Sequence, residues 1–351
     1  MKKILVLTKH GTESASSRQR FFKFFDYWKN AKFDIRVNQL VDKDYLISYN
    51  NGLRYSRYKL LVSYAKRFIF LLKFGFQSDI LFIHRGELFP MFPITFFTRL
   101  FHYLDVKIIV DYDDAVFHSY DENTLLGKLN QIKLNSIIKL SDWVITGSPY
   151  LTDYCKRLNK NVIEIPTSID LEEYKLENTE TVSFTIGWIG SKSTSLHLNT
   201  ILPVLLNFAE KFGVKIKLIG YDKELNLVNN NVQIVDWVEG KDYNLLKDIH
   251  VGIMPLINED FEKGKCGFKL IQYMASAKPF IATPLETNLK IDKNHQNLFA
   301  ESDEDWFFAL EQVYNNYAQY KEIGLNNRLI AEQYYSIQSN AKLYIDVFTK
   351  L

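Results

Sequence analysis

Residues 264–280 read GKCGFKLIQYMASAKPF, a glycine-rich turn followed by a short helical pattern and the start of a strand. After Gly267, the apolar residues Leu270, Ile271 and Met274 recur at helical spacing. Glycines in the turn permit backbone conformations and close approaches that a Cβ atom would block. Because a helix N-terminus carries unpaired N–H groups and a partial positive charge, the stretch predicts an anion site.

Three polar side chains of this stretch suit such a site. Lys265 and Lys269 are placed to add full positive charges to it. Gln272 follows on the same side of the predicted helix as Lys269 and could hydrogen-bond a hydroxyl group of a ligand. The alternative is an ordinary loop-to-helix junction whose lysines only meet solvent, and spacing alone leaves both open.

Outward from this stretch, short apolar runs alternate with helical patterns. Strands are predicted in the first half at residues 3–8, 33–40, 79–86, 107–115, 143–148 and 161–170. After a polar linker the pattern restarts, with a helix over 196–212 and strands at 184–191, 215–222, 231–238, 251–256 and 279–284. Strands that alternate with helices indicate open, doubly wound α/β sheets.

The two sets of strands predict two Rossmann-like domains that face each other across a cleft. We assign the N-terminal domain to residues 1–174 and the C-terminal domain to residues 183–330, joined by the linker at 175–182. The aromatic-rich tail is expected to be helical, and its helix at 331–351 could pack back on the N-terminal domain. At 351 residues, the chain is long enough for two hydrophobic cores.

The composition is that of a globular protein, with 47% hydrophobic and 24% charged residues. The two cysteines, Cys155 and Cys266, lie far apart in sequence and form neither a disulfide framework nor a zinc-binding pattern. No apolar run reaches the roughly 18 residues of a membrane span, so we expect a cytoplasmic protein. The seven histidines are scattered without ligand spacing, and we expect no metal site and no cofactor.

Positive charge is concentrated near the N-terminus. Residues 1–80 hold 16 Lys and Arg against 6 Asp and Glu, a net charge of +10 (16 − 6). Within them, the segment 51–76 has six basic residues, no acidic residue and several interleaved aromatic residues. Such a helix is typical of a segment that lies on an anionic membrane surface, although a core helix with a basic solvent face is the alternative. No nucleic-acid recognition motif is present, so we expect no nucleic-acid partner.

An acidic cluster ends one of the predicted strands. The sequence DYDDA, at 111–115, places Asp111, Asp113 and Asp114 together. Because ligands of open α/β sheets bind beyond the carboxyl ends of the strands, we expect these side chains at the cleft. Repulsion among the carboxylates predicts a raised pKa for at least one of them, which suits a general base. We favour Asp113 or Asp114 for that role and Asp111 for a structural one; capping, or pairing with an arginine, is the alternative for any of the three.

Basic side chains follow two other predicted strands. His84 and Arg85 end the strand at 79–86, so both could line the same cleft, with His84 as a catalytic group. Arg18 and Arg20 follow the first strand, and either could contact a phosphate group, as could Arg85. A structural histidine and solvated arginines are the alternatives.

A second glycine turn, GWIGS at 187–191, follows the first strand of the C-terminal half. A tight turn at Gly190 and Ser191 can present backbone N–H groups to a diphosphate. Because strands often end at glycines, this turn alone is weak evidence for a diphosphate site. Its position relative to the 264–280 stretch is what supports the prediction.

The opening stretch and its surroundings, VGIMPLINEDFEKGKCGFKLIQYMASAKPFIATP, resemble the donor-sugar segment of the retaining glycosyltransferases of family four, which have the GT-B fold. The resemblance extends through residues 107–117, 162–174 and 185–198, and so covers most of the chain from roughly 80 to 330. It implies a nucleotide-diphosphate sugar donor bound by the second domain, and a glycan or lipid-linked acceptor bound by the first. It also implies transfer with retention, no obligatory metal, and a role in bacterial surface polysaccharide or glycoconjugate synthesis.

The resemblance also implies which residues hold the donor. They are Gly190, Ser191, Val238, Lys265, Gly267, Phe268, Lys269 and Gln272. Trp237 and Val238 lie where the family stacks the nucleotide base, although core packing is the alternative for both. Many members carry two glutamates eight residues apart, and this sequence has Gly264 and Gln272 there. This departure leaves open which residue contacts the sugar hydroxyls.

Two functions are therefore compared. The first is a hexosyl-transferring enzyme at the inner face of a membrane. The second is a catalytically silent GT-B scaffold that binds a membrane or a partner enzyme. The missing glutamates favour the scaffold, whereas the lysines and the acidic cluster favour the enzyme.

Overall fold

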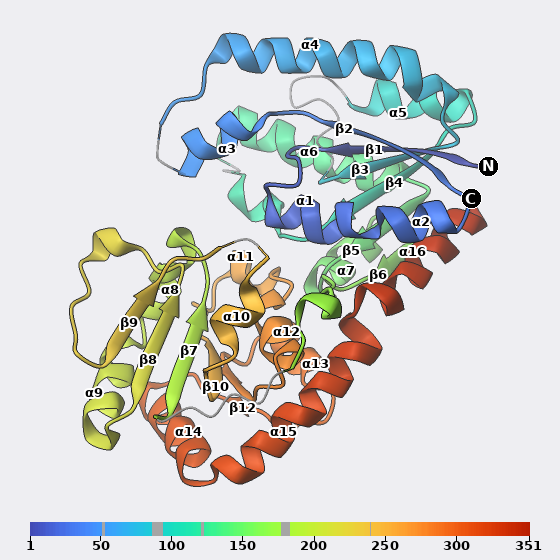
Figure 1. Cartoon of the computed structure of the whole chain (residues 1–351). Helices are drawn as coiled ribbons and strands as arrows, with labels where there is room; N and C mark the ends of the chain where they lie inside the picture. The colour runs from blue at the N-terminus through green and yellow to red at the C-terminus, as the bar shows by residue number, and fades with distance from the viewer. Residues whose placement is uncertain (51–52, 86–93, 121–122, 177–182, 239) are drawn as a thin grey trace. The chain divides into compact units, whose positions relative to one another are not determined.

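The computed structural model describes residues 1–50, 53–85, 94–120, 123–176, 183–238 and 240–351. Most of the predicted linker, residues 177–182, and the first two residues of the basic 51–76 segment lie outside these ranges. The described chain forms two compact units (Figure 1). Unit 1 comprises Met1–Thr167, Gly264–Cys266 and Asn340–Leu351, and unit 2 comprises Ser168–Lys263 and Gly267–Ser339.

In the described part of the chain, unit 1 is built on a parallel sheet of six strands in the order β2-β1-β3-β4-β5-β6. The strands are β1 (Lys3–Thr8), β2 (Asp34–Gln39), β3 (Ile80–His84), β4 (Lys107–Tyr112), β5 (Trp143–Thr146) and β6 (Val162–Glu164). β1, β3 and β4 are buried almost throughout, which is why they read as continuous apolar runs. The strand order reverses at β1 and β3, and such a reversal opens a crevice at the carboxyl edge of the sheet.

The C-terminal helix is attached to unit 1 by aromatic packing. The helices of this unit are α1 (Ala15–Arg20), α2 (Phe25–Asn30), α3 (Lys43–Asn50), α4 (Arg57–Phe74), α5 (Ile94–Tyr103), α6 (Leu125–Leu140), α7 (Pro149–Lys156) and most of α16 (Ile337–Lys350). Trp28 of α2 is fully buried, and its ring centroid lies 5.3 Å from that of Tyr344 and 5.2 Å from that of Phe348. Both α16 residues also pack on Phe82 of β3.

Within the described residues, unit 2 has a second parallel sheet of six strands, in the order β12-β11-β10-β7-β8-β9. The strands are β7 (Thr185–Ile189), β8 (Lys215–Ile219), β9 (Val232–Val235), β10 (Val251–Met254), β11 (Phe280–Ala282) and β12 (Leu298–Phe299). The order reverses between β7 and β10, so the crevice of this sheet lies beyond these two strands. The two sheets confirm the predicted α/β class, although the short β12 was not anticipated.

One predicted helix of unit 2 is two helices. The helices here are α8 (Ser195–Asn199), α9 (Leu202–Phe212), α10 (Asp242–Leu246), α11 (Asp260–Lys263), α12 (Phe268–Ala275), α13 (Glu286–Ile291), α14 (Asp303–Asn315) and α15 (Tyr317–Ile330). The single helix expected over 196–212 is therefore wrong. Pro203 lies in the first turn of α9, the only turn of a helix in which a residue without an N–H group is readily tolerated.

The helix of the opening stretch, α12, is buried on nearly all sides. Gln272 and Ser276, which follow Lys269 along the helix, are only 6% and 2% exposed. They are buried because α12 packs on β10, on α15 and on the 331–335 segment. Only Phe268 and Lys269, in its first turn, are half-exposed.

Tyr273 fixes α12 to the point where the strand order reverses. Its hydroxyl accepts a hydrogen bond from the N–H of Ile189 in β7 (3.2 Å) and donates one to the carbonyl of Ile253 in β10 (2.9 Å). β7 and β10 pair at only two residue pairs, both earlier in the strands, so the hydroxyl joins the strands where their pairing has ended. The ring lies on Gly252, where an added Cβ atom would come within 2.3 Å of it.

We expect Tyr273→Phe to lower the free energy of unfolding by about 1–3 kcal/mol, because it leaves the buried N–H of Ile189 without its acceptor. Urea denaturation of the full chain measures the effect. Tyr344→Phe is the matched control, since Tyr344 is equally buried and its hydroxyl has no hydrogen-bond partner among the described residues. An equal loss in both variants would show that the bridge to β7 and β10 contributes nothing.

Candidate functional site

The glycine turn after β7 is held by its own hydrogen bonds. The N–H of Gly190 donates to the carbonyl of Ile219 (2.9 Å), and the N–H of Ser191 donates to Oγ1 of Thr194 (2.9 Å). A Cβ atom on Gly190 would lie 2.3 Å from the ring of Trp188, so the position requires glycine. The two N–H groups predicted to face a diphosphate are thus both engaged within the protein, and the exposed hydroxyl of Ser191 is the polar group that this turn presents.

Lys269 lies at the same end of the sheet. Its Nζ atom is 4.9 Å from the ring centroid of Trp188, the residue whose ring fills the space beside Gly190. Trp188 is fully buried, so its ring is a rigid surface for the lysine. The structure therefore brings Lys269, the Gly190 turn and the first turn of α12 together at the crevice of unit 2, as expected for an anion site.

The start of α12 depends on Gly267. This residue has φ +65°, a left-handed conformation that favours glycine, and a Cβ atom here would lie 2.2 Å from Cδ1 of Ile291. Phe268 follows as the first residue of the helix and is half-buried. Gln272 is buried and hydrogen-bonds the side chain of Tyr174. To contact a sugar hydroxyl as predicted, Gln272 would therefore have to give up its hydrogen bond to Tyr174.

The residues expected to meet the nucleotide base lie at the same edge of the sheet. Trp237 and Val238 follow β9 and are 39% and 43% exposed. Gly220, at the end of β8, connects them to the glycine turn, because a Cβ atom on it would lie 2.3 Å from the carbonyl oxygen of Gly190 and 3.3 Å from Cβ of Trp237. The indole N–H of Trp237 donates to Asp242 (2.7 Å), which fixes the ring.

A buried pair at this crevice escaped the sequence analysis. His197, in α8, has its Nε2 atom 3.5 Å from Oε1 of Glu262, in α11. Both side chains are almost fully buried, and the N–H of Ile257 also donates to His197 (3.4 Å). The two residues are far apart in sequence, and although each lies in a segment that resembles the family, nothing in either segment indicates that they pair; only the topology reveals the pair.

The first three residues of the opening stretch pack with unit 1 rather than with α12. Gly264 lies against Ala115, and a Cβ atom on it would come within 2.4 Å of the alanine Cβ. Ser148 donates a hydrogen bond to the carbonyl of Gly264 (3.2 Å). A glutamate would not fit at position 264, which gives a steric reason for the departure from the family pattern. Lys265 lies in this segment and is half-buried. It belongs to unit 1, whereas Lys269 belongs to unit 2.

In unit 1, hydrogen-bond donors converge on Asp113. Arg85 donates through Nε to Asp113 (2.6 Å) and through Nη2 to Asp114 (2.6 Å). Nε2 of His84 lies 3.3 Å from Asp113 and 3.0 Å from the hydroxyl of Ser16, which itself donates to Asp113. The structure thus brings the predicted residues His84, Arg85, Asp113 and Asp114 together, and adds Ser16 from α1.

The pKa of Asp113 corrects an expectation. Burial alone would raise it, but the positive charge of Arg85 and the hydrogen bond from His84 hold the pKa well below its ordinary value. Mutual repulsion of the acids does not dominate because a cation lies between Asp113 and Asp114. Asp113 is therefore ionised at neutral pH, and protein donors already occupy both of its oxygens. Asp114 is the more accessible acid, with 31% of its side chain exposed against 8% for Asp113.

Two further arginines have structural contacts. Arg20 is fully buried and forms a bidentate ion pair with Asp111, and it also donates to the carbonyl of Ile165 (2.6 Å). This pair agrees with the structural role expected for Asp111. Arg18 donates to the carbonyl of Thr12 (2.8 Å). These contacts do not connect Arg18 or Arg20 to Arg85. A phosphate contact of Arg18 stays a prediction.

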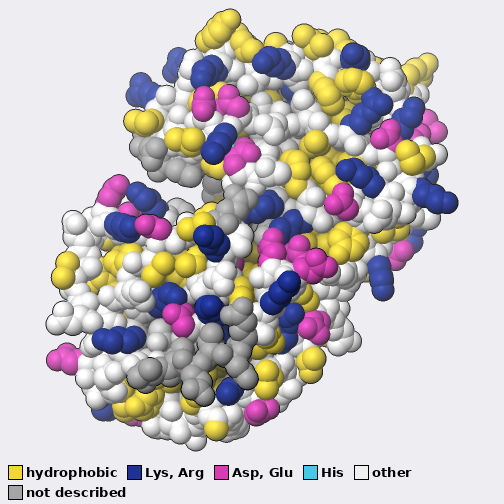
Figure 2. All heavy atoms as spheres, in the orientation of Figure 1, with side chains coloured by type: hydrophobic (Ala, Val, Ile, Leu, Met, Phe, Trp, Pro, Cys, Tyr) yellow, Lys and Arg dark blue, Asp and Glu magenta, His cyan; other side chains and the backbone are white. Residues whose placement is uncertain are grey.

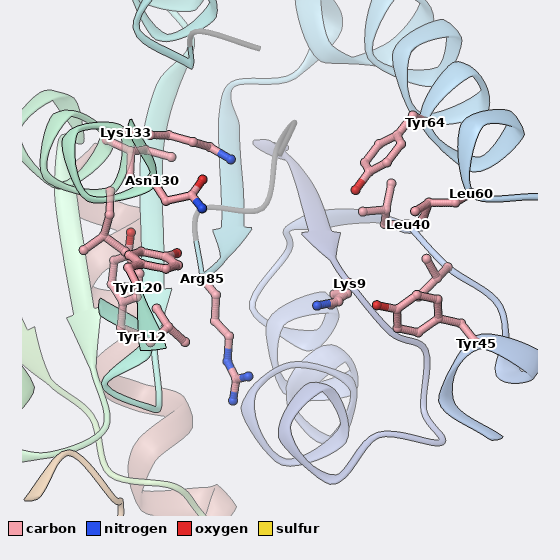
Figure 3. A pocket seen from close by; sticks show the side chains of 14 residues that line it. Lys9, Leu40, Tyr45, Leu60, Tyr64, Arg85, Tyr112, Tyr120, Asn130 and Lys133 are labelled. Carbon is pink, nitrogen blue, oxygen red and sulfur yellow. The ribbon is translucent and has the colours of Figure 1, made fainter. Parts of the chain in front are cut away.

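A pocket of about 270 Å³ opens at the carboxyl edge of this sheet, beside Arg85 (Figure 3). Lys9, which follows β1, and Lys133, in α6, line it together with Arg85. Several tyrosines complete the lining, namely Tyr45, Tyr64, Tyr112 and Tyr120. Sequence analysis missed Lys9 and Lys133 because they lie on elements separated by more than a hundred residues.

The basic 51–76 segment is mostly α4. One of its six basic residues, Arg67, is 1% exposed and donates to the carbonyls of Thr8 (2.6 Å) and Asn38 (2.9 Å). Arg67 is therefore structural, which corrects the expectation that the whole basic set meets a surface. No described helix is both long and apolar enough to cross a membrane.

Comparison with known proteins agrees with this architecture. Residues 182–316 match the family model described as Glycosyl transferases group 1. The matched segment contains the glycine turn after β7, Trp237 and Val238 after β9, and all of α12. Among curated protein sequences, none is similar enough to this chain to count as a match.

Several solved structures share the fold over the whole chain. HepE (Alr3699) from Anabaena, in complex with UDP, has a TM-score of 0.76 at 13% identity, and all of both chains are covered. Sucrose-phosphate synthase from Thermosynechococcus elongatus has a TM-score of 0.72 at 13% identity, again with full coverage of both. A glycosyltransferase from Rickettsia africae has a TM-score of 0.72 at 12% identity, covering 99% of this chain and 98% of that one. The chain therefore has the GT-B fold, and its second unit carries the segment that matches the glycosyl transferases group 1 model.

Proposed function

We propose that this chain is a hexosyl-transferring glycosyltransferase that uses a nucleotide-diphosphate sugar. UDP-sugars are the first donors to test, because HepE was solved with UDP-glucose and TarM of S. aureus with UDP. The acceptor is a glycan or a lipid-linked glycan in bacterial surface polysaccharide or glycoconjugate synthesis. The family-four resemblance supports retention at the anomeric carbon and a reaction without an obligatory metal.

The position of Lys269 carries the proposal. The lysine lies over Trp188, beside the Gly190 turn and in the first turn of α12, at the crevice where the strand order of unit 2 reverses. A fixed cation, a helix N-terminus and a glycine turn at such a crevice suit a pyrophosphate group. The same residues lie inside the segment that matches the glycosyl transferases group 1 model.

In the proposed reaction, the bond between the anomeric carbon of the sugar and the oxygen of the diphosphate breaks. A bond forms between that carbon and the hydroxyl oxygen of the acceptor, whose proton passes to a base. The diphosphate leaves with the bonding electron pair, so negative charge grows on it. Lys269 stabilises this charge more in the transition state than in the ground state, which accelerates the reaction. Lys265 is a second candidate for the same role.

We propose separate roles for the acids of unit 1. Asp113, whose oxygens are occupied by Ser16, His84 and Arg85, positions these groups rather than taking a proton. Asp114 and His84 are the candidate catalytic groups for the acceptor hydroxyl. Asp114 is supported by its exposure, and His84 by its hydrogen bond to the Ser16 hydroxyl at the edge of the sheet.

We also propose that unit 1 rests on an anionic membrane, at the inner face, through α4. Along α4, large apolar side chains are exposed at helical spacing, namely Tyr58, Leu61, Phe68, Ile69 and Leu72. Figure 2 shows hydrophobic side chains among Lys and Arg along the top of unit 1, where α4 lies in Figure 1. The helix contains no acidic residue, so its charge complements an anionic lipid surface.

Removing the cation tests the donor site. We expect Lys269→Met to lower kcat for sugar transfer from a UDP-sugar by about 10²–10³-fold, the effect of losing one preorganised donor. Lys211→Met is the matched control, because Lys211 also lies 4.9 Å from an aromatic ring centroid, that of Phe307, but in the last turn of α9, at the opposite edge of the sheet.

Turnover by Lys269→Met equal to that of the control would reject the assignment of Lys269. The scaffold alternative predicts a different pattern, in which UDP stabilises the wild-type chain against thermal unfolding but no UDP-sugar is hydrolysed or transferred.

The charge of Asp113 is tested by pH. Since its folded-state pKa is lowered, its ionisation stabilises the folded chain above the ordinary aspartate pKa of about 4. This stabilisation is lost as the pH falls through the folded-state pKa. We expect Asp113→Asn to be less stable than wild type at pH 7, and the difference in unfolding free energy to shrink below about pH 4. A difference that stays constant from pH 7 to pH 3 would contradict the lowered pKa.

Vesicle binding tests the membrane surface. We expect the triple variant Leu61→Ser, Ile69→Ser, Leu72→Ser to bind phosphatidylglycerol vesicles at least about tenfold more weakly than wild type, because each side chain loses apolar burial. Leu325→Ser with Leu329→Ser is the control, as these α15 residues are also exposed. Co-sedimentation measures binding, and an equal loss in both variants would reject α4 as the contact.

A further inference from the structure

The unit 1 pocket is positively charged. Lys9, Arg85 and Lys133 line it, and no acidic side chain does so among the described residues. The amino groups of Lys9 and Lys133 point into the space from two different walls, and the guanidinium group of Arg85 lies below them in the view of Figure 3. Arg85 is ion-paired with Asp113 and Asp114, so Lys9 and Lys133 are the other two cationic side chains of the described lining.

A tyrosine of the strand end underlies the pocket. Tyr112, the last residue of β4, lines the pocket and is only 2% exposed. Its hydroxyl is buried in the protein and has no hydrogen-bond partner among the described residues. Tyr112 therefore contributes no hydrogen bond to the pocket, and the charged groups of the described lining are those of Lys9, Arg85 and Lys133.

The size and the walls limit what the pocket can hold. Its volume, about 270 Å³, lies just below the roughly 300–1,000 Å³ of typical small-molecule sites, which suits a head group rather than a long glycan. Tyr64 of α4 and Asn130 of α6 add polar groups to opposite walls. Both helices also carry exposed apolar side chains, such as Leu61 and Leu129, which do not line the pocket.

We infer that this pocket binds a phosphate group carried by the acceptor. The inference rests on the proposed function, because it assigns the acceptor side of that reaction a chemical class. Lys9 and Lys133 provide charge-assisted hydrogen bonds to the phosphate oxygens. The phosphate belongs either to a lipid-linked acceptor, presented beside α4, or to a soluble phosphorylated one.

Phenyl phosphate is the probe for this site, and calorimetry in saturating UDP measures its binding, so that the donor site is already filled. We expect the double variant Lys9→Gln with Lys133→Gln to weaken binding of phenyl phosphate by about tenfold or more. Lys128→Gln with Lys139→Gln is the matched control, since these exposed lysines of α6 do not line the pocket. Benzyl alcohol, which has no charge, should not bind.

Equal affinity in the lysine double variant and its control, or equal binding of benzyl alcohol, would overturn the inference. If UDP does not bind the wild-type chain at all, the proposed function fails, whereas the lysine dependence of phenyl phosphate binding still reports on the pocket.

Vesicles distinguish the two sources of phosphate. Phosphatidylcholine vesicles that contain phosphatidic acid should displace phenyl phosphate from the wild-type chain if a lipid supplies the group. Vesicles that leave phenyl phosphate in place would assign the pocket to a soluble phosphorylated acceptor.

Discussion

The hydroxyl of Tyr273 replaces strand pairing at the point where β7 and β10 separate, and the candidate donor site depends on that replacement. One oxygen atom accepts from Ile189 and donates to Ile253, while Gly252 leaves room for the ring. These contacts fix α12 on the sheet. Lys269 lies one turn before Tyr273, so the packing of a core tyrosine decides where the cation stands. A charge whose position is set by the hydrophobic core does not need to reorganise when a pyrophosphate leaves.

Unit 1 uses a different device to hold charge. Arg85 has φ +54°, a conformation that costs a non-glycine residue on the order of 1–3 kcal/mol. Its ion pairs with Asp113 and Asp114, supported by His84 and Ser16, offset that cost. The acids that looked like proton acceptors in the sequence therefore include one, Asp113, whose oxygens are committed to keeping an arginine in place.

The sequence predicts the strands well because a strand buried on both faces is a continuous apolar run, whatever surrounds it. It predicts α12 as a helix, but not its burial, because α15 and the following turn cover it from more than forty residues away. The break between α8 and α9 had a local signal, because Pro203 favours the first turn of a helix; the prediction of one helix over 196–212 did not use it. The pairing of His197 with Glu262, and the meeting of Lys9 with Lys133, have no local signal. They arise only when parallel strands bring distant loops to one edge.

Arg67 gives α4 a significance beyond its outer face. This buried guanidinium group binds the carbonyl of Thr8, the last residue of β1, and Lys9 comes next in the chain. The helix and the strand end are therefore mechanically joined at a single side chain. The place of Lys9 in the pocket is therefore coupled to the seating of α4.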